Sequence, residues 1–167
     1  MNRPYRKSPR LHNFDYSTGG TYFITICTKE KHCVLAQISV GEGLAPPALT
    51  LLPFGKIAAE QIHALACRFP SVTIDKYVIM PNHIHMLLTL AETGGASCQP
   101  GSGPSPTVST VIGVFKSLTT RACRIGEPLF QRSFHDHIIR TKQDYDMIWD
   151  YIDKNPLKWA EDRFYCD

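Results

Sequence analysis

The sequence predicts an α+β fold, a ferredoxin-like antiparallel sheet with helices packed on one face. Segments rich in β-branched and aromatic residues alternate with segments in which apolar residues recur at helical spacing. The order of these segments is roughly β-α-β followed by β-α-β, and two strand candidates are joined by a two-residue turn. A chain of 167 residues has the length of a single domain and can bury a core without disulfides.

The first half of the chain contains three strand candidates and one helix candidate. Alternation and turn-forming neighbours mark the strands, of which the first follows a Gly-Gly break and is expected to be central. Apolar residues at helical spacing predict a helix over 54–68, and Pro53 is well placed to start it. The strand candidates are 21–28, 33–39 and 48–52.

A hairpin is predicted in the middle of the chain. It consists of a strand over 71–80, the turn Pro81-Asn82 and a returning strand over 83–90. The segment 92–106 is rich in Gly, Ser and Pro, which indicates a flexible loop.

The last part of the chain predicts two amphipathic helices around a strand. The helices are expected over 108–123 and 144–155, and Pro156 ends the second because it disfavours helix at the residue before it. The strand is expected over 134–140. We therefore expect a single domain over 1–167, with a basic N-terminal arm at 1–15.

Composition limits the class of protein. Six cysteines are scattered without a C-x-x-C pair, so a zinc ribbon or a disulfide scaffold is not indicated and reduced thiols are expected. No apolar run approaches 18 residues, so neither an export signal nor a membrane span is expected. A cytoplasmic location follows as the prediction.

Two histidines open the returning strand of the hairpin. Because side chains alternate along a strand, His83 and His85 project to one face while Ile84 and Met86 project to the other. Two imidazoles at this spacing can converge on one metal ion. Taken alone, such a pair is more often only the polar face of a strand.

A tyrosine and an asparagine share one face of the last predicted helix. Tyr151 and Asn155 stand at i and i+4, with Asn155 at the helix end where its amide can reach outward. One helix face therefore carries a hydroxyl of the kind that acts as a nucleophile and an amide oxygen of the kind that binds a metal ion. On spacing alone, a structural role fits better, with Tyr151 packed on the sheet and Asn155 ending the helix.

Four segments of the chain resemble, in order and spacing, the single-tyrosine HUH transposases. The resemblance covers about Tyr16 to Trp159, and Asn155-Pro156 is closer to the REP-associated tyrosine transposase branch than to the insertion-sequence branch. The segments are Tyr16-Ser17 with Tyr22-Phe23-Ile24-Thr25, Met80-Pro81-Asn82-His83-Ile84-His85, Phe115-Lys116-Ser117, and Tyr151-Ile152-Asp153-Lys154-Asn155-Pro156.

The resemblance implies a mechanism and a set of roles. In that family two histidines and an amide bind a divalent ion, and a tyrosine attacks a phosphodiester of single-stranded DNA. His83, His85 and Asn155 would be the metal ligands and Tyr151 the nucleophile. The implied product is a 5′-phosphotyrosine with a free 3′-hydroxyl. Single-stranded or hairpin DNA is the implied partner, and a homodimer is compatible with it.

The implied chemistry agrees with the residue types. A tyrosine hydroxyl has an ordinary pKa of about 10, so it needs a base or a nearby cation to become a nucleophile. Two imidazoles and an amide are neutral ligands, which leave the charge of the ion available to the scissile phosphate. We expect Mg or Mn in function, and Ni or Zn can occupy such nitrogen-rich sites in a crystal.

Basic residues are unevenly distributed on a chain of formal charge +3. Single-stranded DNA is held by positive grooves with aromatic stacking platforms, so two basic runs are candidate DNA contacts. The first comprises Arg3, Arg6, Lys7 and Arg10 with Tyr16, and the second Lys116, Arg121, Arg132 and Arg140.

Two other functional classes remain open from the sequence. One is a non-catalytic DNA-binding descendant of a transposase, which a nicking assay would distinguish. The other is a metal-dependent phosphoesterase in which tyrosine is not a nucleophile; a covalent protein–DNA adduct would exclude it.

Overall fold

The computed structural model describes residues 19–39, 47–91 and 106–165. The expected N-terminal arm, with Arg3, Arg6, Lys7, Arg10 and Tyr16, and nearly all of the expected loop at 92–106 lie outside these residues. The elements are β1 (Gly20–Cys27), η1 (Lys29–Lys31), β2 (Ala36–Ser39), β3 (Ala48–Leu51), α1 (Pro53–Arg68), β4 (Val72–Ile79), β5 (His83–Leu90), α2 (Val108–Ala122), β6 (His135–Ile139), α3 (Lys142–Lys154) and η2 (Asn155–Glu161).

The main sheet has four strands in the order β4-β5-β1-β6, and every neighbouring pair is antiparallel. This order places the first strand between the third and the last, as in the ferredoxin-like split β-α-β arrangement. The predicted α+β fold with an antiparallel sheet is therefore confirmed. β2 and β3 form a separate two-stranded antiparallel sheet.

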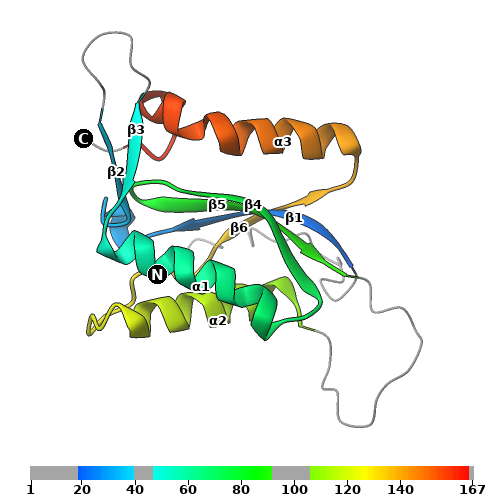
Figure 1. Cartoon of the computed structure of the whole chain (residues 1–167), viewed down its shortest axis with the longest axis horizontal. Helices are drawn as coiled ribbons and strands as arrows, with labels where there is room; N and C mark the ends of the chain where they lie inside the picture. The colour runs from blue at the N-terminus through cyan, green and yellow to red at the C-terminus, as the bar shows by residue number, and fades with distance from the viewer. Residues whose placement is uncertain (1–18, 40–46, 92–105, 166–167) are drawn as a thin grey trace, which may run out of the picture.

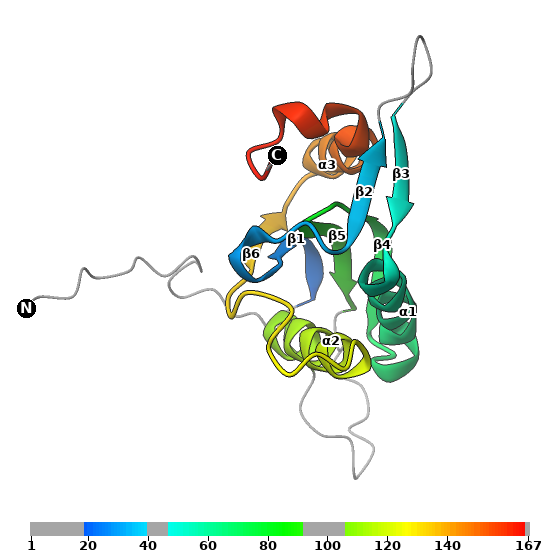
Figure 2. The same ribbon diagram turned by 90° about the vertical axis from the view of Figure 1, so that its left-hand side faces the viewer.

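The helices lie on both faces of the main sheet, so the expectation that they share one face is wrong for α3. Figures 1 and 2 show α1 and α2 together on one side and α3 with η2 on the other. Two separate apolar clusters agree with the figures. The larger includes Ile62 of α1 and Phe115 of α2, whereas Ile152 of α3 belongs to the smaller one.

The central strands explain why both faces are covered. In β5, Ile84 and Met86 belong to the cluster beneath α1 and α2, whereas Leu87 belongs to the cluster beneath α3. A strand that is apolar on both faces needs cover on both faces, because exposing either one would cost hydrophobic free energy. His83 and His85 point to the face covered by α3, together with Leu87.

The starts of the helices have local causes. α1 begins at Pro53, whose missing N–H is not needed in the first turn. Thr107 and Thr141 are the N-caps of α2 and α3, and their hydroxyls accept hydrogen bonds from the backbone N–H groups of Thr110 and Asp144. The helix that carries Tyr151 therefore has a defined origin at the end of β6.

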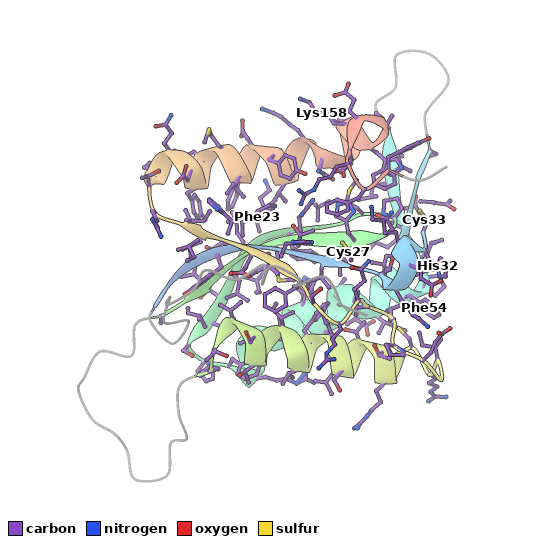
Figure 3. The ribbon with its side chains drawn as sticks, turned by 180° about the vertical axis from the view of Figure 1, so that it is seen from behind. Phe23, Cys27, His32, Cys33, Phe54 and Lys158 are labelled. Carbon is purple, nitrogen blue, oxygen red and sulfur yellow. The ribbon has the colours of Figure 1, made fainter. Side chains whose placement is uncertain are left out.

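The cysteines depart from the sequence expectation at one residue. Cys27, Cys67 and Cys123 are free thiols, but Cys33 is disulfide-bonded. Cys33 is exposed in the segment between η1 and β2 (Figure 3). The prediction of reduced thiols is therefore wrong for Cys33. No helix among the described residues is long and apolar enough to cross a membrane.

Candidate active site

The histidine pair lies at the start of β5, an inner strand of the main sheet, on the face covered by α3. His83 and His85 are 0% and 1% exposed, and their Nε2 atoms are 3.0 Å apart. In the register of β1 against β5, Cys27 lies opposite His83 and Thr25 lies opposite His85. Both imidazoles are therefore fixed by two hydrogen-bonded strands.

Each imidazole is oriented through its Nδ1 atom. The Asn82 amide nitrogen donates to the Phe164 carbonyl at 2.7 Å, so the Asn82 Oδ1 must face His83. That oxygen can only accept, and it lies 2.9 Å from His83 Nδ1, which therefore carries the proton. The Nε2 of His83 consequently presents a lone pair to the site.

His85 has more freedom, because its Nδ1 partner is a hydroxyl. Thr25 Oγ1 lies 2.8 Å from His85 Nδ1 and can either donate or accept. With the proton on Nε2, His85 donates to His83; with the proton on Nδ1, both Nε2 lone pairs face the same point. The second arrangement is the one that a metal ion requires.

Burial keeps both histidines neutral. Removal from water lowers the pKa of His83 to about 4, with Arg163 and Lys31 acting in the same direction and Asp162 against it. The pKa of His85 is also lowered by burial, and then by His83 and Arg163. Neutral imidazole is the form that binds metal.

Tyr151 projects from α3 onto the histidine pair. Its hydroxyl lies 3.4 Å from His85 Nε2, and the two ring centroids are 5.3 Å apart. Phe23 stacks on His85 at 5.1 Å and meets Tyr151 edge-on at 5.9 Å; Figure 3 shows it between the sheet and α3. Tyr151 is still 43% exposed, so its side chain is accessible from outside the protein.

The Tyr151 hydroxyl is a phenol in this environment. Burial raises its pKa, as does the charge of Asp162, whereas a hydrogen bond with Asn155 and the charge of Arg163 lower it. The phenol therefore needs additional positive charge or a proton acceptor before it can act as a nucleophile.

Asn155 is buried next to the same cluster. It is 3% exposed, and its Nδ2 donates to Asp162 Oδ2 at 3.1 Å. Its Oδ1 is buried without a hydrogen-bond partner, which among the described residues is true of one other side-chain oxygen, that of Asp136. An unpaired buried acceptor is costly unless a donor or a cation satisfies it.

Asp162 is a site residue that the sequence interpretation missed. Its carboxylate and the ring nitrogens of His83 and His85 all lie within 4.8 Å of one another, which makes this trio able to hold a metal ion. Two histidines with one carboxylate are a common ligand set. The only signal in the sequence is a carboxylate seven residues after Asn155, and no helical or strand period marks it.

The donor set fits a divalent cation. Two neutral imidazoles, a carboxylate and an orphaned amide oxygen combine nitrogen and oxygen ligands in a buried place. Two Nε2 lone pairs this close repel each other, so without a cation one Nε2 must carry a proton and donate it to the other. A divalent ion held by this trio would be bound by both Nε2 lone pairs and by the Asp162 carboxylate.

The segment after η2 closes the site. The Phe164 ring lies 4.6 Å from the His83 ring, and its backbone N–H donates to Asp162 Oδ1 at 2.7 Å. A cavity of about 440 Å³ opens beside this segment, and its lining includes Met147, Tyr151, Asn155, Asp162 and Arg163. Tyr151 is thus reached from a cleft between α3 and the C-terminal segment.

The second predicted basic run is only partly brought together. Lys116, Arg121 and Arg132 line a cavity of about 510 Å³ at the end of α2. Lys116 is already engaged, because its ammonium donates to the carbonyls of Gln131 and Ser133 at 2.9 and 2.7 Å. Arg140 follows β6 whereas Arg132 precedes it, so these two lie at opposite ends of that strand.

Comparisons with known proteins give a relative in sequence and several solved structures with a similar fold. No model of a known protein family matches the chain. A protein of Haemophilus influenzae, described only as uncharacterized, is 32% identical over 176 residues, covering 98% of this chain and 94% of that protein. The structure of a REP-associated tyrosine transposase bound to a REP hairpin matches with a TM-score of 0.62 and 24% identity, covering 89% of this chain and 73% of that chain.

The structural match concerns the fold. A transposase-like protein of Deinococcus radiodurans R1, named only provisionally, matches with a TM-score of 0.47 and 15% identity, too distant to carry an argument. The expected likeness to the REP-associated branch is confirmed for the arrangement of helices and strands.

Proposed function

We propose that this chain, which belongs to the same family as the Haemophilus influenzae protein and has the fold of a REP-associated tyrosine transposase, cleaves and rejoins single-stranded DNA as a transposase. One observation carries the proposal. The Tyr151 hydroxyl lies 3.4 Å from His85 Nε2, beside a trio of residues able to hold a metal ion.

His83, His85 and Asn155 would hold a divalent ion, with Asp162 as a further ligand. When bound, such an ion supplies positive charge beside the scissile phosphate and the departing oxygen. The carboxylate makes the ligand set anionic and adds an oxygen donor, which favours Mg or Mn more than two imidazoles and an amide would.

Tyr151 supplies the nucleophile. Its oxygen forms a bond to phosphorus while the bond from phosphorus to the 3′-oxygen breaks. The proton of the phenol ends on the departing 3′-hydroxyl, so the protein keeps a 5′-phosphotyrosine and no nucleotide cofactor is consumed. Because the phosphotyrosine retains the energy of the phosphodiester, attack by a new 3′-hydroxyl reverses the step and joins the strands.

DNA with a single-stranded segment is the proposed substrate. The structural neighbour is bound to a REP hairpin, and Tyr151 here opens to a cleft that a single strand can enter. Arg121 and Arg132 are exposed cations beside one cavity and are proposed to contact phosphates. Lys116 is proposed to have a structural role, because its hydrogen bonds fix the loop before β6 that carries Arg132.

A covalent-adduct assay tests the proposal. Labelled single-stranded oligonucleotide containing the native target, incubated with the protein and Mn²⁺, should give a labelled species that survives a denaturing gel. Tyr151→Phe removes the nucleophilic oxygen but keeps the ring that packs on Phe23 and His85. This variant should form no adduct and bind DNA within a few-fold of the parent.

Tyr145→Phe is the matched control, because Tyr145 lies on the same helix and also packs on the sheet. It should retain adduct formation. Cleavage by the parent without any adduct would refute the tyrosine mechanism. DNA binding without cleavage would instead favour the non-catalytic descendant.

A further inference from the structure

Arg163 is the cation that the C-terminal segment places at the candidate active site. Its guanidinium carbon lies 4.6 Å from the centre of the Phe164 ring, and that ring lies 4.6 Å from the ring of His83. Stacking on an aromatic face holds a guanidinium in one plane without using its hydrogen-bond donors. Arg163 also lines the same cavity as Tyr151.

Arg163 has no ion-pair partner within the described part of the chain. None of the salt bridges among residues 19–39, 47–91 and 106–165 involves it. By contrast, Lys154 of the same cavity pairs with Asp150 at 2.7 Å. Arg163 is exposed, so its donors are open to a ligand that enters the cavity.

The field of Arg163 reaches every reacting group. Its charge lowers the pKa of His83, of His85 and of Tyr151. Lys158, which lines the cavity from η2 (Figure 3), has no such effect on any of them. The planar fork of an arginine also matches two oxygens of one phosphate, whereas a lysine offers a point charge.

We propose that Arg163 binds the non-bridging oxygens of the phosphodiester that Tyr151 attacks. The inference rests on the proposed function, since it names the residue that recognises the reacting group. Arg163 then does two things from one position: it anchors the strand in the cleft between α3 and the C-terminal segment, and it offsets the negative charge that grows on the phosphate during attack.

The binding test uses a protein that cannot cleave. In a Tyr151→Phe background with Mn²⁺, the affinity for a labelled single strand is measured by fluorescence anisotropy at several salt concentrations. Loss of one phosphate contact should reduce the slope of log affinity against log salt by about 0.7. Arg163→Gln should show this smaller slope. Arg163→Lys, which keeps the positive charge, should have a slope close to that of the parent.

Arg68→Gln is the matched control, because Arg68 is an exposed arginine at the end of α1, on the other face of the sheet. It should leave the salt slope unchanged. Denaturant unfolding of each variant shows that the fold is intact. If Arg163→Gln and Arg68→Gln show the same slope of log affinity against log salt, the inference is wrong.

The catalytic test separates this inference from the proposed function. With Tyr151 present, Arg163→Gln should form the covalent adduct roughly a hundred-fold more slowly than the parent, with Arg163→Lys in between. A parent that forms no adduct contradicts the proposed function. An Arg163→Gln protein that matches the parent in adduct rate contradicts the inference alone.

Discussion

Asp162 changes the chemistry of the site at the scale of a single residue. It brings a negative charge to within 4.8 Å of two neutral imidazole nitrogens and fixes the amide of Asn155 through a 3.1 Å hydrogen bond. The Asn155 nitrogen donates to Asp162, whereas its buried Oδ1 has no hydrogen-bond partner. Asp162 thus belongs to the trio that could hold a metal ion and also fixes the amide of Asn155.

Replacing Asp162 should therefore weaken metal binding. Asp162→Asn keeps the shape but removes the charge, and we expect the affinity for Mn²⁺, measured by calorimetry, to fall roughly ten- to a hundred-fold. Asp146→Asn, a surface change on α3 that loses only the pair with Lys142, should bind the ion like the parent. Equal affinity in the two variants would remove Asp162 from the ligand set.

The sequence could predict part of this site for a definite reason. His83 and His85 belong to one strand and Tyr151 and Asn155 to one helix, so local periodicity places each pair on a common face. The meeting of the two pairs came from family resemblance, not from periodicity. Asp162 and Arg163 follow a 3-10 helix that bends back over the sheet, and no local period predicts where such a segment returns.

At the scale of elements, the position of α1 depends on a close backbone approach. A side chain at Gly55 would place its Cβ 2.0 Å from the carbonyl oxygen of Leu35. The same carbonyl accepts a hydrogen bond from the Leu52 N–H at 2.9 Å, which ties the start of α1 to the segment before β2. Only glycine allows both contacts.

Two glycine-to-alanine substitutions test this packing. Gly55→Ala should lower the free energy of unfolding by more than about 2 kcal/mol, because backbone must move to admit the methyl group. Gly113→Ala, in the middle of α2 with nothing within 4 Å of the added atom, should raise it by about 0.5 to 1 kcal/mol. Urea unfolding measures both, and equal effects would contradict the structure at α1.

The helices and strands were predictable from periodicity, but the face occupied by α3 was not. The expected bounds lie within three residues of the observed ones, with the largest difference at the start of β2, which is Ala36 where residue 33 was expected. Asn155 has helical backbone angles and the chain continues as η2, so Pro156 changes the type of helix there. The near-continuous apolar run of β5 leaves both faces in need of cover, and the sequence alone does not say which helix covers which face. Tyr151 reaches the histidines because α3 lies on the side of the sheet away from α1 and α2 (Figure 2).

At the scale of the whole molecule, the buried histidines tie stability to pH. The pKa of His83 is about 4 in the folded chain, below the ordinary 6.5, and that of His85 is also lowered. The unfolded chain therefore takes up protons between pH 6.5 and about 4 that the folded chain does not. The free energy of unfolding must fall as the pH falls through this window.

With chelator present, the free energy of unfolding should drop by at least about 2 kcal/mol between about pH 7 and about pH 5. His83→Gln removes one of the two titrating groups and should reduce this drop by roughly 2 kcal/mol. Urea unfolding at the two pH values measures the difference. A parent that is equally stable at both would show that these histidines are not buried as described.

The central claim is that Tyr151 becomes covalently attached to DNA, and peptide mapping of the adduct tests it most directly. After reaction with a single-stranded target, nuclease and trypsin treatment should leave a nucleotide on the peptide 143–154, which contains both Tyr145 and Tyr151. Fragmentation by mass spectrometry should place the phosphate on Tyr151. A phosphate on Tyr145, or on any residue outside this peptide, would contradict the account.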